Sequence, residues 1–116
     1  MNDEGNTSVP PTTLESVLNT TDLDERAFRP PNFEAENTAL LALAQHMADS
    51  PNSVLQKLVE IAMETCGAGS AGVSLVNKEG TEFYWPAVAG EWKPYTGGGT
   101  PRNFGPSGIV VDRHAV

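Results

Sequence analysis

The chain has 116 residues, of which 15 are acidic and 7 are basic, and its formal net charge is −8. This length suits one small domain. The sequence has no cluster of Lys and Arg, which argues against a nucleic-acid-binding protein. A single cysteine, Cys66, excludes an intrachain disulfide and is typical of a reducing compartment.

Membrane and secretion signals are also missing from the sequence. No apolar run approaches the roughly 20 residues of a membrane span, and the first residues lack the basic and apolar regions of a signal peptide. We therefore expect a cytoplasmic protein with no membrane partner.

Residues 1–31 are rich in Asn, Thr, Ser, Pro and acidic side chains and contain few large apolar ones. Such a segment buries too little surface to offset the entropy lost on ordering. Residues 1–36 hold eight acids and two arginines, so most of the negative charge lies there. We predict a disordered acidic leader over 1–31 and a folded domain over 32–116. Thr12 and Glu15 have the spacing of a capping box, which favours a short helical turn.

The next segment has the pattern of an amphipathic helix from Asn32 to Ala48. Asn32 can accept a hydrogen bond from a free N–H group of the first turn. Apolar residues at steps of three and four form one stripe. They are Phe33, Leu40, Leu41, Ala44, Met47 and Ala48. Two interpretations stay open: the stripe packs on the sheet of its own domain, or it pairs with a partner helix in a homodimer.

A second helix is predicted after Asp49. Ser50 is its expected N-cap, and Pro51 suits the first helical position, where a missing N–H group costs nothing. A second apolar stripe contains Val54, Leu55, Leu58, Val59, Ala62 and Cys66. Gly67 fits the left-handed position that ends many helices. Because Cys66 falls on the stripe, we expect a packed, unreactive thiol.

A β-hairpin follows the second helix. In Ala71–Val76 the apolar Val73 and Leu75 alternate with Gly72 and Ser74, and this period of two is typical of a strand. Asn77–Gly80 supplies turn residues, and Glu82–Val88 has the aromatic and β-branched density of a second strand. Pro86 cannot donate to a ladder, so either this strand lies at a sheet edge or Pro86 lies at a bulge. A hairpin alone is marginally stable, so we expect the second helix to cover it.

The segment after the hairpin is irregular. Gly97–Gly99 is not followed by the Lys and Ser or Thr of a P-loop, which favours a flexible connection. Phe104–Arg113 predicts a turn that enters a short helix with Ser107 as its N-cap. Arg102 beside that helix start would suit an anionic group of a ligand. We expect His114–Val116 to begin another strand.

No residue pattern indicates catalysis. His46 and His114 have neither the spacing of metal ligands nor that of a Ser/His/Asp triad, so we predict no metal site and no catalytic residue. Asp112 and Arg113 fit pairing or capping at a helix end better than chemistry. We therefore predict that this chain is not an enzyme.

The order of the predicted elements resembles the GAF domain, a sensory module of bacterial sensor histidine kinases, cyclases, phosphodiesterases and photoreceptors. The likeness is to the N-terminal GAF modules of bacterial sensor kinases, and it covers residues 32–116. Three segments carry it: Glu36–Ala44, Ser70–Leu75 and Gly97–Gly108, the last followed by Asp112 and Arg113.

The resemblance implies an α+β fold, with an antiparallel sheet, helices on its faces, and a ligand pocket lined by loops and a short helix. The residues that fall in those lining segments are Trp92, Tyr95, Arg102, Phe104 and Ser107. We expect them to contact a ligand. Many GAF relatives carry Cys where this chain has Ser107, and Cys66 falls in the opposite layer, so a covalently bound bilin is not expected. The cofactor is otherwise unknown.

A GAF domain needs roughly 150 residues, so the resemblance implies a domain truncated after the short helix near 106–112. Ala71–Val76 would then pair with Glu82–Val88 on one side only. Its open edge would invite strand addition from another chain. We expect the isolated chain to be weakly folded, or oligomeric through that edge.

The expected function is a partial sensory, ligand-binding GAF-type module of a bacterial signal-transduction protein. The resemblance implies a two-component system whose intact parent is a sensor histidine kinase, which rests on analogy. The alternatives are a non-catalytic module that homodimerises through the Asn32–Ala48 helix or the strand edge, and a truncated fragment without a ligand. The expected partners are accordingly a small molecule or a second copy of the chain.

Overall fold

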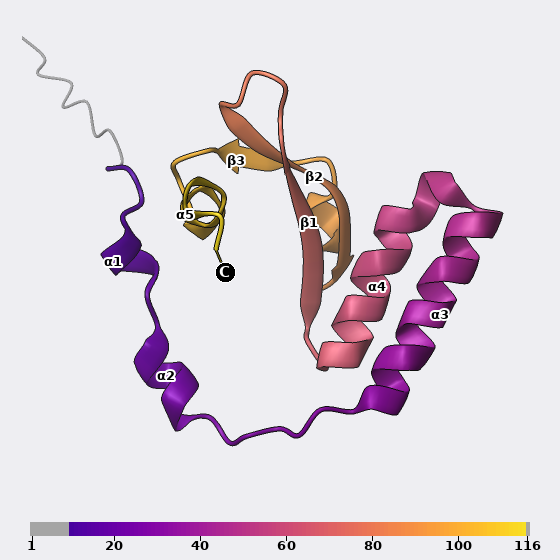
Figure 1. Cartoon of the computed structure of the whole chain (residues 1–116). Helices are drawn as coiled ribbons and strands as arrows, with labels where there is room; N and C mark the ends of the chain where they lie inside the picture. Colours follow the sequence, from indigo (N-terminus) through magenta and orange to yellow (C-terminus); the bar gives the residue numbers. More distant parts are fainter. Residues whose placement is uncertain (1–9, 116) are drawn as a thin grey trace, which may run out of the picture.

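The predicted hairpin forms the centre of the fold (Figure 1). The structure is a computed structural model and describes residues 10–115. Strands β1 (Ser70–Val76) and β2 (Glu82–Gly90) pair in antiparallel fashion. Asn77 organises the turn, because its Oδ1 atom accepts from the backbone N–H groups of Thr81 (2.9 Å) and Glu82 (3.2 Å). Gly80 supplies the left-handed residue, with φ of +73°.

A third strand makes β2 the middle strand of the sheet. β3 (Gly99–Pro101) pairs with the beginning of β2, and the strand order is β1-β2-β3. The alternative that placed the second strand at a sheet edge is therefore wrong. β1 pairs on one side with β2, and within residues 10–115 its outer edge has no strand neighbour.

The second alternative for Pro86, a β-bulge, is confirmed. Val73 pairs with Ala87, but Leu75 pairs with Tyr84, so the register shifts by one residue between them. Trp85 and Pro86 thus lie opposite the single residue Ser74. A proline is tolerated there because the extra residue of a bulge leaves the ladder.

The bulge decides which side chains of β2 reach each face of the sheet. Side chains alternate along a strand, and one extra residue reverses the alternation. Beyond the bulge, Ala87 and Ala89 pack against Val59 of α4 (Val54–Cys66). Phe83 and Val88 are buried on the opposite face.

Helix α4 covers one face of the sheet, and α3 (Phe33–Asp49) lies on α4 (Figure 1). The core consists of Val59, Ala87 and Ala89, with Leu55, Met63, Ala71 and Val73 packed around them. The predicted cap of α3 is confirmed, since Asn32 Oδ1 accepts from the N–H group of Ala35 at 3.0 Å. Gly67 ends α4 with φ of +62°, also as predicted.

The start of the second helix differs from the prediction. Pro51–Ser53 forms a 3-10 turn, η1, and α4 begins at Val54. The Ser50 side chain makes no capping hydrogen bond. Its carbonyl oxygen instead accepts from the N–H group of Ser53 (3.1 Å), which tightens the corner between α3 and α4.

The predicted apolar stripe of α3 does not pack on the sheet. Its large members are exposed: Phe33 73 %, Leu40 66 %, Leu41 65 % and Met47 55 %. The half-buried side chains of α3 are Ala39, Leu43 and His46. The interpretation of packing on the domain's own sheet is wrong because α4 already covers that face. We call the four exposed residues the outer face of α3.

Cys66 is exposed, which contradicts the expectation of a packed thiol. It is the last residue of α4, and Met63, one turn earlier, is the last helix residue packed against the core. The stripe therefore extends past the end of the apolar contact. The Cys66 carbonyl accepts from Arg29 Nη1 at 3.2 Å.

The described part of the leader forms two short helices, α1 (Leu14–Val17) and α2 (Thr20–Glu25), without buried residues. The first-turn bond of α1 uses Thr13 and Ser16 rather than the predicted Thr12 and Glu15. Thr12 N–H donates to the Asn103 carbonyl at 2.8 Å. Disorder over 1–31 stays a prediction, and residues 1–9 lie outside the described part of the chain.

The last helix, α5 (Pro106–Arg113), lies on the side of the sheet away from α4 (Figure 1). Its N-cap is Gly105, so the prediction of Ser107 is wrong; Pro106 takes the first helical position and Ser107 the second. His114 ends the helix with φ of +53°. The predicted strand is therefore absent at His114 and Ala115, and Val116 lies outside the described residues. Within residues 10–115, no helix combines the length and apolar character needed to cross a membrane.

Candidate ligand cavity

A cavity of about 580 Å³ lies on the sheet face opposite α4. Its floor comes from β1 and β2, and its walls come from β3, the segment around η2 (Lys93–Tyr95) and the start of α5. The lining residues are Ser70, Ala71, Gly72, Ser74, Phe83, Trp85, Val88, Trp92, Tyr95, Thr100, Gly105, Pro106 and Ser107. The volume falls within the range of roughly 300–1,000 Å³ that is typical of small-molecule sites.

The backbone of Trp85 is held at the bulge by two hydrogen bonds to the glycine segment. Its N–H group donates to the Gly98 carbonyl (2.9 Å), and its carbonyl accepts from Gly97 N–H (2.8 Å). A Cβ atom added to Gly98 would lie 3.3 Å from Trp85 Cε3, so the glycine loop passes directly over the indole. Gly98 therefore allows close packing on an aromatic ring, in a segment where the sequence favoured a flexible connection.

Trp92 and Tyr95 supply the exposed side of the aromatic wall. Their side chains are 65 % and 62 % exposed. The backbone beneath them is nevertheless bonded, because Trp92 N–H donates to Ser70 Oγ (3.2 Å) and Tyr95 N–H donates to the Trp92 carbonyl (2.9 Å). These rings can adjust to a ligand while their attachment points stay in place.

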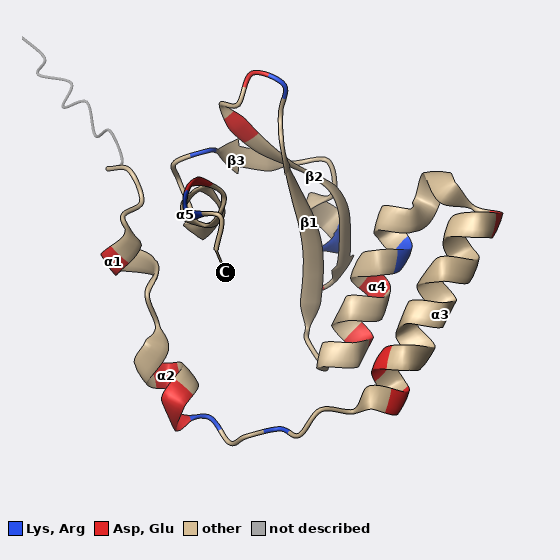
Figure 2. Cartoon of the chain, viewed as in Figure 1, with Lys and Arg blue, Asp and Glu red and all other residues tan. Residues whose placement is uncertain are grey.

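Aliphatic hydroxyl groups reach the cavity lining from three elements. Ser70 and Ser74 lie on β1, Thr100 on β3 and Ser107 on α5. None of the described residues that line the cavity is charged. Figure 2 shows β1 free of acidic and basic residues, whereas acidic residues mark α1, α2, α3 and α4.

The structure places the predicted site residues in three different surroundings. Trp92, Tyr95 and Ser107 line the cavity. Phe104 is 53 % exposed and lines neither this cavity nor the second one found among the described residues. Arg102 lines that second cavity, of about 350 Å³, between the turn after β1 and α5.

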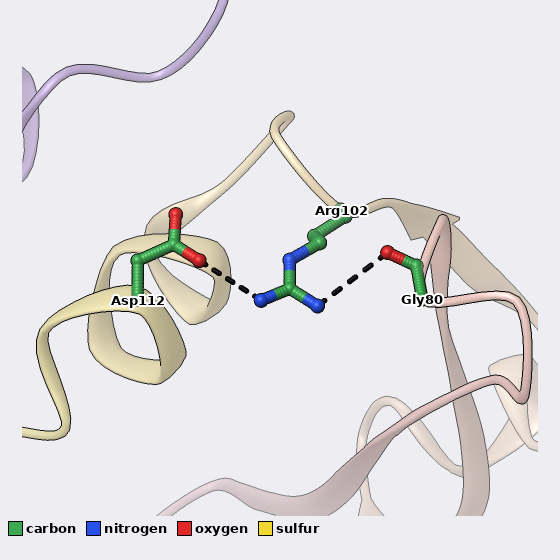
Figure 3. A network of polar contacts seen from close by, with 3 residues as sticks. All are labelled: Gly80, Arg102 and Asp112. Carbon is green, nitrogen blue, oxygen red and sulfur yellow. Dashed lines mark hydrogen bonds and ion pairs between the residues drawn. The ribbon is translucent and has the colours of Figure 1, made fainter.

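Arg102 acts as a tie between two segments rather than as a free cation (Figure 3). Its Nη2 atom donates to Asp112 Oδ1 at 2.9 Å, and its Nη1 atom donates to the Gly80 carbonyl at 3.4 Å. Asp112 belongs to the last turn of α5. The guanidinium is thus already paired near the helix end, and contact of Arg102 with an anionic group of a ligand stays a prediction.

The sequence did not point to the other ten lining residues, which include the large side chains Phe83, Trp85 and Val88 of β2. An alternating strand does not disclose which of its faces carries a cavity. Pro86 was the available signal, because a bulge there changes the faces of the residues on either side of it.

The other chemistry-bearing side chains lie elsewhere. His46 Nε2 lies 2.7 Å from Ser53 Oγ, at the corner between α3 and η1. Cys66 ends α4, in the layer opposite the cavity. Among the described residues, no three His, Cys, Asp or Glu side chains are grouped as metal ligands.

Comparison with known proteins leaves the family open. No family model matches the chain, and no curated protein or solved structure compared with it is significantly similar.

Proposed function

We propose that this chain is a sensory, ligand-binding module of the GAF type, acting in the cytoplasm as part of a bacterial signal-transduction protein. The observation that supports the proposal best is the cavity, which joins an aromatic wall to hydroxyl groups on the sheet face left free by α4. The resemblance of Gly97–Gly108 to the GAF domain, read from the sequence alone, is the second reason for the proposal. A two-component system with a sensor histidine kinase as parent is the context that this resemblance suggests.

A ligand in the cavity would act on the helices through β2. Val88 lines the cavity, while its neighbours Ala87 and Ala89 pack on Val59 of α4. The Val88 carbonyl also accepts from Gln56 Nε2 of α4 at 3.2 Å. Suppose that β2 has two arrangements, each coupled to its own arrangement of α4 and α3. A ligand that binds one of them more tightly would raise its population, and the ratio of the two affinities sets the size of that change.

The test is a thermal-shift screen of the chain with nucleotides, haem, bilins and uncharged aromatic compounds. A ligand that binds only the folded state raises the melting temperature by mass action. Ser74→Phe, which places a ring in the cavity, should abolish the rise, whereas Thr65→Phe on the exposed end of α4 should preserve it. Absence of any shift across the screen would contradict the proposal.

A second candidate function, a non-catalytic dimerisation module, is favoured by the outer face of α3. Exposed apolar patches of this kind often mark protein interfaces. Sedimentation equilibrium of the chain and of Leu41→Glu tests it, with Gln45→Glu on the same helix as the charge-matched control. Stable dimers that only Leu41→Glu dissociates, together with a cavity that binds nothing, would favour this function over sensing.

A further inference from the structure

We propose that the ligand of the cavity is an uncharged, planar aromatic molecule that carries at least one hydrogen-bonding atom. This inference rests on the proposed function and names the chemical class of ligand for the same site. It follows from three properties of the lining: its aromatic side chains, its lack of charge and its hydroxyl groups.

The aromatic side chains favour a flat ligand. Trp85, Trp92 and Tyr95 come from the bulge of β2 and the segment around η2, so rings from two elements face one space. Offset stacking and edge-to-face contacts between rings add to the gain from area burial. Trp85 supplies the best-packed ring of the three, because Gly98 lies directly against its indole.

The lack of charge disfavours an anionic ligand. Arg102, on α5's side of the sheet, lines the other cavity and is paired with Asp112. Moving an anion out of water without a paired cation is costly, and the net charge of −8 repels it at long range. The start of α5 supplies at most about half a positive charge.

A cationic ligand is disfavoured by the same lining. The faces of Trp85 and Trp92 could attract a cation. The cavity has no carboxylate among its described lining residues, however, and the positive end of α5 contributes to its wall. An uncharged ring avoids the cost of moving either an anion or a cation out of water.

The hydroxyl groups of the lining are the reason for proposing a hydrogen-bonding atom on the ligand. Ser74, Thr100 and Ser107 belong to three elements around the cavity, and each hydroxyl can donate or accept. A carbonyl, ring nitrogen, amine or phenol on the ligand would find a partner without needing a charged group.

The experiment uses two fluorescent probes that differ by one charge. N-phenyl-1-naphthylamine is neutral, and 1-anilinonaphthalene-8-sulfonate has the same rings with a sulfonate added. In titrations of the full chain, we expect the neutral probe to bind at least tenfold more tightly. Indole should displace it at lower concentration than either indole-3-acetate or tryptamine.

Variants locate the binding and keep the test independent of folding defects. Ser74→Phe should abolish binding of the neutral probe, whereas Leu41→Gln, on the outer face of α3, should leave it unchanged. Ser74→Lys should reverse the preference, so that the sulfonate binds more tightly than the neutral probe. Loss of folding would not produce such a gain. Circular dichroism verifies that each variant has the wild-type secondary structure.

The outcomes separate the two proposals. Equal or tighter binding of the sulfonate or of tryptamine, lost in Ser74→Phe, would overturn the uncharged ligand class and leave the sensory function standing. Probe binding that is lost in Leu41→Gln but kept in Ser74→Phe would overturn both, as would the absence of binding. Preferential, Ser74-dependent binding of the neutral probe supports both.

Discussion

Arg102 and Asp112 connect the end of β3 to the last turn of α5 through an ion pair of 2.9 Å (Figure 3). The same guanidinium reaches the Gly80 carbonyl in the turn after β1. One side chain thus connects the segment after β3 both to α5 and to the turn between β1 and β2. The arginine also lies near the C-terminal end of α5, where a positive charge is favourable.

We expect Asp112→Asn to lower the free energy of unfolding only slightly. The two side chains are 33 % and 62 % exposed, and exposed ion pairs typically contribute about 0.2–1 kcal/mol. Urea denaturation at low and high salt measures the effect, which should shrink as salt screens the pair. A loss well above 1 kcal/mol that is insensitive to salt would show that this pair stabilises the fold more than an exposed ion pair does.

Gly108→Ala should displace α5 from the segment that follows β3. A Cβ atom at Gly108 would lie 2.1 Å from the Arg102 carbonyl oxygen, a backbone atom that cannot rotate away. Overpacking of this kind typically costs about 1–3 kcal/mol. Amide exchange should report faster opening of α5. Gly105→Ala is the control, because a Cβ atom there meets nothing within 4 Å; equal effects of both variants would refute the packing argument.

Val59→Ala should destabilise the contact between α4 and the sheet. Val59 is 2 % exposed and packs against Ala87 and Ala89. Removing two buried methyl groups costs about 2 kcal/mol when the cavity left behind is included. Chemical denaturation gives the value. Val110→Ala, at a 44 % exposed site, should cost much less. A Val59→Ala variant that is as stable as the wild type would show that Val59 does not belong to the core.

Amide exchange should be uneven across the sheet. Phe83 and Tyr84 of β2 have strand partners on both sides, Val76 and Leu75 on one and Thr100 and Gly99 on the other. β1 has one strand neighbour within residues 10–115, so amides that point to its outer edge should exchange quickly in a monomer. Sedimentation establishes the oligomeric state of the sample. Uniform protection of β1 in a proven monomer would contradict the open edge.

Much of the backbone could be predicted from the sequence because its signals are local. Asn32 caps α3, Gly67 ends α4 and Gly80 closes the turn of the hairpin, each through a bond or dihedral angle within a few residues. The turn signals and the two strand patterns sufficed to predict the pairing of β1 with β2. Trp92 and Tyr95 line a cavity, and their contact with a ligand stays a prediction.

The buried face of α3 was not predictable from its sequence. Residues 39–44 are all apolar, so several faces of this helix could have been buried, and the hydrophobic effect has no direction of its own. The structure half-buries the side with Leu43 and leaves Leu40 and Leu41 exposed.

What the sequence by itself determined is therefore the helices α3 and α4, the hairpin of β1 and β2, and the ends at Asn32, Gly67 and Gly80, since caps and turns depend on neighbours in the chain. Only the tertiary structure decided which faces meet: the bulge at Pro86 set the orientation of Trp85, and Asp112 engaged Arg102. Those outcomes depend on contacts between distant segments, and a shift of one residue in strand register is enough to reverse the faces.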